Sequence, residues 1–149
     1  MLSVVGYSEL VFAVKACTSA SVALCWVPGI YVYYCYELEI GTNNNTETVL
    51  RSSIGGPILK SAQTPQILNC DSMPLFWVTW KNGYISFGKG PVPDQGAVFT
   101  VNDPEWHSIY SVSFLTPIGV TGIWMTSAAT GMFRSDVTIS VVTLTSCTT

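Results

Sequence analysis

An aromatic run that stops at Asn82-Gly83 and then resumes constrains the fold more than any other feature of this sequence. Residues 76–80 read Phe-Trp-Val-Thr-Trp, and the run resumes after the Asn-Gly pair as Tyr-Ile-Ser-Phe. Asn-Gly between two such runs is the strongest short-range signal of a β-hairpin, because both residues accept the positive φ angles of a two-residue turn. Successive side chains of a strand point to opposite faces, so Phe76, Val78 and Trp80 are expected to share one face and to lie in the core.

The same two-residue period runs through most of the chain. In Tyr-Glu-Leu-Glu-Ile at 36–40, apolar and acidic residues alternate, as in a strand with one wet face. No window of a dozen residues shows helical spacing, and turn residues separate the apolar runs. The predicted strands are 11–17, 21–26, 30–40, 76–80, 84–87, 97–101, 108–115, 121–126 and 137–145. The sequence therefore predicts an all-β fold, a single antiparallel β-sandwich of jelly-roll-like form over residues 1–149.

The chain carries few charges. Of its 149 residues 10% are charged, and six Lys and Arg against nine Asp and Glu give a net charge of −3. It contains no basic run, which argues against nucleic acid as a partner, because phosphate binding needs clustered Lys and Arg. Serine and threonine, 16 of each, supply much of the polarity instead. A surface of this kind is poorly protected against association, so we expect glycans, further copies of the chain or neighbouring domains to cover part of it.

Two uncharged stretches, 16–36 and 107–133, are long enough to be compared with membrane spans. Pro28-Gly29 interrupts the first, Pro117 and several glycines interrupt the second, and both contain Ser and Thr. No transmembrane segment is therefore predicted. The first ten residues also lack the basic n-region of a secretory signal peptide, so we expect no signal in this stretch.

The cysteine pattern leaves two readings open. The chain contains no Cys-x-x-Cys pair and a single histidine, His107, so a zinc site is not expected. The cysteines are either small buried hydrophobic residues in a reducing compartment or partners in one or two disulfides in an oxidising one. The sequon Asn44-Asn45-Thr46, with Asn44 as glycan acceptor, favours an extracellular location, secreted or at the cell surface. The candidates for disulfide bonding are Cys17, Cys25, Cys35, Cys70 and Cys147, and the odd number leaves one unpaired or bridging to another chain.

Patterns that carry catalysis are absent from the sequence. The nearest glycine-rich loop, Gly-Lys-Gly at 88–90, runs into Pro91 and so cannot open a helix that cradles a cofactor. No Gly-x-Ser-x-Gly elbow occurs, and His107 is the one candidate base. The carboxylates with possible catalytic or calcium-binding roles are read as turn residues: Asp71, Asp94, Asp103, Glu105 and Asp136. We therefore expect no enzyme activity, no catalytic residue, no metal and no cofactor.

The stretch from Phe76 to Gly90, with Phe-Trp-Val-x-Trp, Asn-Gly and Gly-x-Gly in that order, resembles the farnesoic acid O-methyltransferase-like domain. Four further stretches agree with that family, and together the matches span about residues 11–126: 12–17, 36–51, 67–71 and 122–124. The resemblance implies an antiparallel β-sandwich of the kind found in extracellular, multidomain animal proteins. It also brings Asn45 and Arg51 forward as candidate binding residues. The family name implies methyl transfer to a sesquiterpenoid acid, although the matching residues include no loop for the methyl donor.

Two non-enzymatic functions are favoured, and an enzyme is ranked third. The first is a non-catalytic recognition or adhesion module that binds glycans or extracellular proteins through loops at one end of the sandwich. Its ligand-binding candidates are Trp106, His107, Asp103, Asn45 and Arg51. The second is a structural subunit that forms homo-oligomers or filaments when a terminal strand, such as the Ser/Thr-rich 137–149, adds to a sheet edge. The third is a methyltransferase acting on a small apolar acid.

Overall fold

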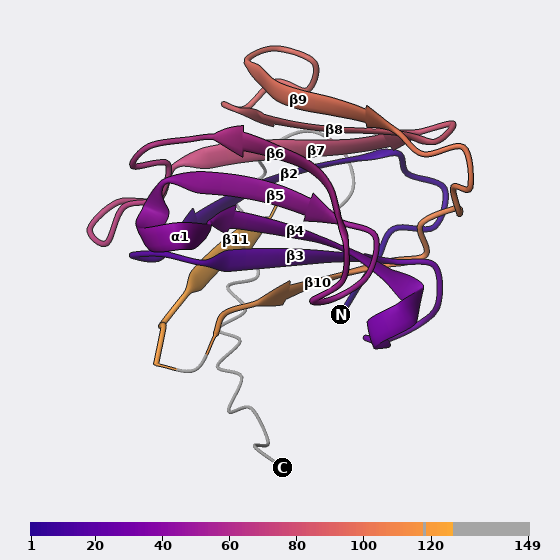
Figure 1. The fold of residues 1–149 in the computed structure, drawn as a ribbon, viewed down its shortest axis with the longest axis horizontal. Helices are drawn as coiled ribbons and strands as arrows, with labels where there is room; N and C mark the ends of the chain where they lie inside the picture. Colours follow the sequence, from indigo (N-terminus) through magenta and orange to yellow (C-terminus); the bar gives the residue numbers. More distant parts are fainter. Residues whose placement is uncertain (118, 127–149) are drawn as a thin grey trace.

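The computed structural model describes residues 1–117 and 119–126, which form two antiparallel sheets packed face to face (Figure 1). The first sheet has the strand order β1 (Leu2–Ser3), β10 (Ser111–Leu115), β3 (Ala20–Cys25), β4 (Cys35–Gly41), β5 (Glu47–Arg51), β6 (Ile58–Gln63). The second has the order β11 (Ile123–Thr126), β2 (Glu9–Lys15), β7 (Leu75–Lys81), β8 (Tyr84–Lys89), β9 (Ala97–Asn102). Helical turns are confined to η1 (Val32–Tyr34) and α1 (Thr42–Asn45) within the described ranges. The predicted all-β sandwich is confirmed.

The order of the strands gathers the loops at two ends of the sandwich. β3 to β6 form a meander in one sheet and β7 to β9 a meander in the other, and every pair of neighbours is antiparallel. One group of loops, which we call the aromatic end, consists of residues 4–8, 26–34, 52–57, 82–83 and 103–110. The other group, the α1 end, consists of 16–19, 42–46, 64–74, 90–96 and 116–122 without 118, and α1 marks it on the left of Figure 1.

Phenylalanine rings join the two sheets in the core. Phe12 on β2 lies 5.8 Å from Phe76 on β7 and 6.1 Å from Phe114 on β10, measured between ring centroids. Phe114 in turn stacks on Trp124 at 4.7 Å. All four side chains are buried, so these rings fill space between the two sheets.

The predicted hairpin is present, with Asn82 at φ 50° and Gly83 at φ 82° between β7 and β8. Phe76 and Val78 are buried in the core as expected, and Trp80 packs against the core at its edge. The opposite face is covered as well, because Trp77 is fully buried and its Nε1 donates to the carbonyl of Gln95 at 2.7 Å.

Gly88 of the Gly-x-Gly motif has a packing role. A Cβ at this position would lie 2.2 Å from Cζ2 of Trp77, so only glycine allows the indole to lie against β8. This glycine of the motif therefore serves the hydrophobic packing of the sheet.

Several predicted strands differ from those observed. The strand expected over 30–40 begins only at Cys35, because Pro28-Gly29 and η1 turn the chain first. β10 likewise begins at Ser111 where 108 was expected, and β1, β5 and β6 were missed. The acidic face of β4 is only partly wet: Glu37 is 9% exposed, since the 52–57 loop folds over it, whereas Glu39 is partly exposed. The strand predicted at 137–145 lies outside the described residues.

Four of the cysteines form two disulfides, Cys17–Cys70 and Cys25–Cys35. Cys25 and Cys35 are direct partners in the β3–β4 pairing, and their bond closes the 26–34 loop. Cys17–Cys70 links two loops of the α1 end and is exposed to solvent, whereas Cys25–Cys35 is buried. Cys147 lies outside the described residues. Within those residues, no helix is long and apolar enough to cross a lipid bilayer.

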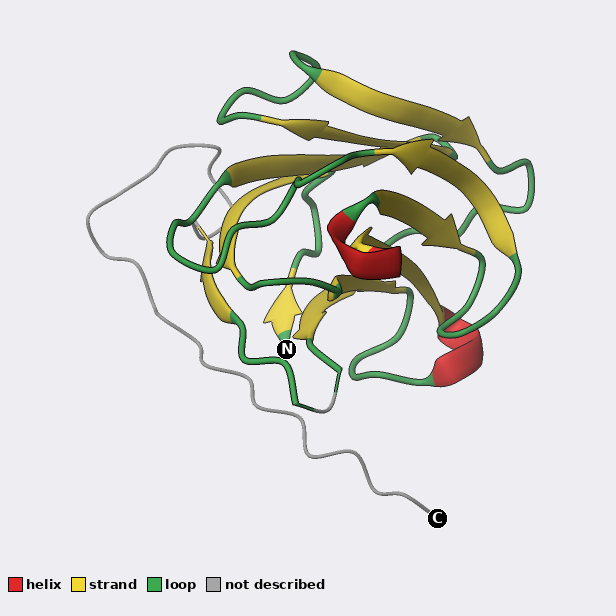
Figure 2. Ribbon diagram, turned by 60° about the vertical axis from the view of Figure 1, so that its left-hand side comes forward, coloured by secondary structure: helices red, strands yellow, loops and turns green. Residues whose placement is uncertain are grey.

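Figure 2 shows the sandwich turned by 60°, with η1 and α1 as two separate short red segments between strands. Loops that contain these two helical turns form part of the surface at the ends of the described fold. Functional side chains have to be looked for in these loops.

Candidate functional site

Exposed apolar side chains gather in the loops of the aromatic end. They belong to three of its five loops: Val5, Tyr7, Ile30, Tyr31, Val32, Tyr33, Tyr34, Trp106 and Tyr110. Among the described residues, the loops of the α1 end expose one large apolar side chain, Val92. A concentration of exposed apolar side chains of this kind is typical of an interaction site.

A pocket of about 480 Å³ opens at the same end. Its walls come from Gly6–Ser8, from the tip of the β7–β8 hairpin, and from Trp106–Ile109, with Ile85 and Tyr36 also in the lining. This volume lies in the range of small-ligand sites in proteins. The pocket thus brings together three loops that are far apart in the sequence.

Two tryptophans fix the walls of the pocket. The Nε1 of Trp80 donates to the carbonyl of Tyr7 at 3.0 Å and so holds the 4–8 loop on the hairpin. Trp106 lies against the hairpin turn, because a Cβ on Gly83 would come within 2.6 Å of its Cδ1. The Asn-Gly turn therefore has two roles: it closes the hairpin, and its missing side chain makes room for Trp106.

Asp103, three residues before Trp106, accepts hydrogen bonds on both carboxylate oxygens. Its Oδ2 accepts a hydrogen bond from the Tyr36 hydroxyl at 2.5 Å, and its Oδ1 accepts one from the amide of Glu105 at 3.0 Å. Burial, followed by the hydrogen bond and the nearby negative charge of Asp103, raises the pKa of Tyr36 well above its ordinary range. Asp103 consequently orients the turn that carries Trp106.

His107 belongs both to the pocket and to the 26–34 loop. It lines the pocket, and its imidazole stacks on Trp26 with 4.2 Å between ring centroids and 15° between planes. Trp26 also contacts Tyr36 at 5.4 Å and Tyr34 at 6.3 Å. Three of the predicted residues, Asp103, Trp106 and His107, are thus together at the aromatic end.

Asn45, a fourth predicted residue, lies at the α1 end, away from this pocket. Its Nδ2 donates to the carbonyl of Leu68 at 2.9 Å, and its Oδ1 accepts the amide of the same residue at 3.0 Å. Such a pair of bonds occupies the amide group and ties α1 to the 64–74 loop. The contacts of Asn45 are those of a structural residue.

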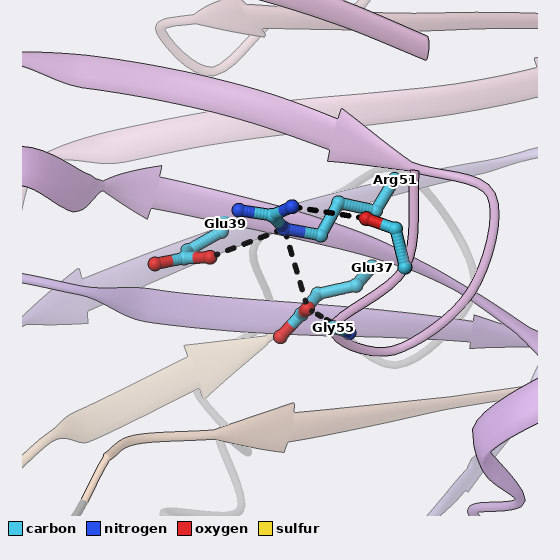
Figure 3. Close-up of polar contacts among 5 residues, drawn as sticks. Glu37, Glu39, Arg51 and Gly55 are labelled. Atoms are coloured by element: carbon cyan, nitrogen blue, oxygen red, sulfur yellow. Dashed lines mark hydrogen bonds and ion pairs between the residues drawn. The ribbon is translucent and has the colours of Figure 1, made fainter. Parts of the chain in front are cut away.

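Arg51, the fifth predicted residue, lies on the outer face of the first sheet (Figure 3). Its guanidinium donates to the carbonyl of Gly56 at 3.0 Å and lies 3.9 Å from Glu37 and 3.6 Å from Glu39. Glu37 also accepts the amide of Gly55 at 3.0 Å. This network closes the 52–57 loop over β4, and it lies apart from the pocket.

Asn44, the predicted glycan acceptor, is exposed in α1 with φ 63°. An attached glycan would extend from the α1 end and leave the aromatic end uncovered. Within the described residues there is no group of three or more His, Cys, Asp or Glu side chains that could hold a metal ion.

Sequence reasoning missed most of the aromatic surface. The tyrosines of 31–34 were assigned to a strand, and Tyr7 and Trp26 were not considered as site residues. The available signal was Tyr-Val-Tyr-Tyr directly after Pro-Gly and inside a loop bracketed by two cysteines. An aromatic run that follows turn residues is compatible with an exposed loop, and not only with a strand.

By its fold this protein is a two-sheet β-sandwich domain, and the loops at one end of the sandwich form a pocket. The chain belongs to the family described as farnesoic acid O-methyl transferase, because the model of that family matches residues 2–129. This match confirms the resemblance seen over about residues 11–126. Neither curated proteins nor solved structures give a match to the chain.

Proposed function

We propose that this protein is a non-catalytic extracellular recognition module that binds carbohydrate in the pocket of the aromatic end. The proposal is supported by the composition of that pocket, which is lined both by aromatic rings and by short hydroxyl and amide side chains. Trp106 and Tyr7 offer apolar ring surface, and Ser8, Ser108 and Asn82 offer hydrogen-bonding groups. Sugars have apolar ring faces edged by hydroxyls, so both kinds of group have partners on them.

The charges near the pocket support a neutral ligand. Lys81, the ammonium in the lining, is exposed and lies 3.8 Å from Asp94. Asp103 is engaged by Tyr36 and by the amide of Glu105. Hydroxyl groups bind through oriented hydrogen bonds and need no countercharge, which fits a site of this kind.

An extracellular location is supported by the two disulfides. Cys17–Cys70 is exposed, and exposed disulfides do not persist in a reducing cytosol. The exposure of Asn44 makes the sequon accessible to glycosylation. Mass spectrometry of the protein expressed in a eukaryotic secretory host, before and after glycosidase treatment, tests the modification directly.

The proposal includes the absence of catalysis. His107 is the single imidazole of the pocket lining, and its ring faces Trp26, which leaves no carboxylate or hydroxyl hydrogen-bonded to it in the described structure. We expect no methyl transfer when the protein is incubated with farnesoic acid and isotopically labelled S-adenosylmethionine. Turnover above that of a heat-inactivated sample would overturn this part of the proposal.

The binding test compares three proteins on a glycan array and by titration calorimetry. Trp106→Ala removes the wall of the pocket, and Val92→Ala removes an exposed apolar side chain at the α1 end as a matched control. We expect a sugar selected by the wild type to be retained by the control and lost by Trp106→Ala, because aromatic residues in such pockets carry much of the binding energy. Trp106 is 46% exposed, so its removal should leave the circular dichroism spectrum unchanged. Absence of binding to every glycan contradicts the proposal.

Assembly is a second candidate function, favoured by β6. This strand lies at the end of its sheet, pairs with β5 on one side, and exposes Ile58 and Leu59. An exposed edge with apolar side chains can accept a strand of another copy. Light scattering of the wild type and of Leu59→Lys at increasing concentration tests this. A wild type that stays monomeric excludes it.

A further inference from the structure

The 26–34 loop beside the pocket is a preformed, uncharged aromatic surface. It contains no Asp, Glu, Lys or Arg, and its tyrosines are exposed, Tyr33 by 80%. The Cys25–Cys35 disulfide closes its base, and the amide of Tyr34 donates to the carbonyl of Tyr31 at 2.9 Å. The amide of Ile54 donates to Val32 at 3.1 Å, which anchors the loop to its neighbour. Little conformational freedom remains to be lost when a ligand binds here.

This surface is continuous with the pocket. His107 lines the pocket and stacks on Trp26 at 4.2 Å, Trp26 contacts Tyr34 at 6.3 Å, and Tyr34 contacts Tyr31 at 6.4 Å. Each distance joins two ring centroids. The four rings therefore form an unbroken series of contacts that starts at the pocket. A ligand that fills the pocket and continues past His107 therefore meets the 26–34 loop.

We propose that the ligand is a neutral oligosaccharide chain, with one sugar in the pocket and the following sugars along the 26–34 loop. This inference rests on the proposed carbohydrate function and specifies the form of the sugar. Each tyrosine of the loop offers an apolar ring face and a hydroxyl that can form hydrogen bonds. Each sugar of a chain likewise offers an apolar ring face and hydroxyls, so several sugars can contact several tyrosines in turn.

The charge around the series favours a neutral chain over an acidic one. Glu105, next to Trp106, is exposed, and no Lys or Arg lies in the 26–34 or 103–110 loop. Along these two loops an acidic polysaccharide would meet this carboxylate without a compensating cation, because the ammonium of the pocket, Lys81, already lies 3.8 Å from Asp94. A neutral chain meets no such repulsion. A protein partner would also fit exposed tyrosines, and binding measurements with sugars distinguish the two.

The test measures affinity against chain length. The monosaccharide chosen by the glycan array and its oligomers of increasing length are titrated into the wild type, Tyr31→Ala, Tyr34→Ala and Tyr84→Ala. Tyr84 is an exposed tyrosine at the start of β8, outside the pocket lining, and serves as the matched control. We expect wild-type affinity to rise with length, and Tyr31→Ala and Tyr34→Ala to weaken the longer oligomers by about threefold to tenfold. Both should bind the monosaccharide like the wild type.

The outcomes separate this inference from the proposed function. Monosaccharide binding that depends on Trp106, with no gain for longer chains, overturns the inference and leaves the pocket function standing. Tighter binding of an acidic oligomer than of its neutral counterpart also overturns it. Failure of every sugar, together with capture of a protein that is lost in Tyr31→Ala and Tyr34→Ala, overturns both. Tyr34→Phe keeps the ring and should lose less affinity for the longer oligomers than Tyr34→Ala.

Discussion

The loops at the two ends of the sandwich use their side chains differently. At the α1 end, polar side chains bond to the backbone: Asn45 to Leu68, and Asn69 to the amides of Asp71 and Ser72. At the aromatic end, the tyrosines of 31–34 stay exposed. Loops whose polar groups are satisfied internally hold the fold together, and loops that present apolar rings to solvent are available to a ligand. We therefore expect a ligand at the aromatic end, where the rings are exposed.

The disulfides provide the largest expected contrast between the ends. Cys17–Cys70 spans 53 residues and Cys25–Cys35 spans 10. Because the chain entropy removed by a cross-link grows with the enclosed length, we expect losses in the free energy of unfolding of about 4 kcal/mol for Cys17→Ala/Cys70→Ala and about 3 kcal/mol for Cys25→Ala/Cys35→Ala. Alanine is used because serine at the buried positions 25 and 35 would add the cost of two buried hydroxyls. Urea denaturation measures both.

Ligand binding should reverse the order of the two double variants: the variant that loses less stability should lose more affinity. The Cys25→Ala/Cys35→Ala protein frees the 26–34 loop and should weaken oligosaccharide binding. The Cys17→Ala/Cys70→Ala protein, assayed where it is folded, should bind like the wild type. Equal binding by both would mean that loop closure at the aromatic end contributes only to stability.

Two glycines of the aromatic end test the contact between Trp106 and the hairpin turn. Gly83 has φ +82° and Gly6 has φ +83°, so alanine incurs the same backbone cost at both positions. Alanine at 83 also meets the carbonyl of Asp103 at 2.8 Å, whereas alanine at 6 meets nothing within 4 Å. We expect a loss in the free energy of unfolding of about 3 kcal/mol for Gly83→Ala and about 1 kcal/mol for Gly6→Ala, measured by urea denaturation. Similar losses would show that Trp106 moves aside without cost.

The sequence predicts local geometry well and tertiary placement poorly. Asn82-Gly83 specifies its turn through its own φ angles, so the hairpin is recognised without knowledge of the rest of the chain. β6, with Ile-Leu-Lys-Ser-Ala-Gln, lacks alternation because it is an exposed edge strand, and it was missed. The aromatic run at 30–34 has strand propensity, but Pro28 lacks an amide for a sheet, and the chain must return for Cys35 to face Cys25.

The candidate site shows the same division. Asp103, Trp106 and His107 are neighbours in the sequence and come together in space. Asn45 and Arg51 were placed with them through the family resemblance, and their actual partners, Leu68 and the 52–57 loop, are set by strand pairing that no short motif reveals. Their proposed part in ligand binding therefore has to be tested against a structural one.

Asn45→Ala is the variant that makes this test at the α1 end. It removes two hydrogen bonds and leaves the amide and carbonyl of Leu68, a buried residue, without these partners. We expect a loss in the free energy of unfolding of about 2 kcal/mol, because unsatisfied buried polar groups carry a desolvation cost. Sugar binding should be unchanged. A variant with wild-type stability and impaired binding would place a ligand contact at the α1 end and break the contrast between the ends.

The smallest effect concerns the pH dependence of Tyr36 at the aromatic end. Its pKa is raised in the folded protein, first by burial and then by Asp103, so the folded state retains the phenolic proton at pH values where the unfolded chain releases it. The stabilisation is complete below the ordinary tyrosine pKa of about 10, and it declines as pH rises from there towards the folded-state pKa, by about 1 kcal/mol per pH unit.

Comparison with Tyr36→Phe isolates this contribution, because phenylalanine keeps the ring against Trp26 and has no proton to lose. We expect the free energy of unfolding of the wild type, from urea denaturation at about pH 9 and pH 11, to fall more steeply with pH than that of the variant. Parallel pH profiles would mean that the hydroxyl ionises as freely in the folded protein as in the unfolded chain. In that case the bond to Asp103 could not be what orients the turn carrying Trp106, and the wall of the pocket would depend on the Gly83 contact alone.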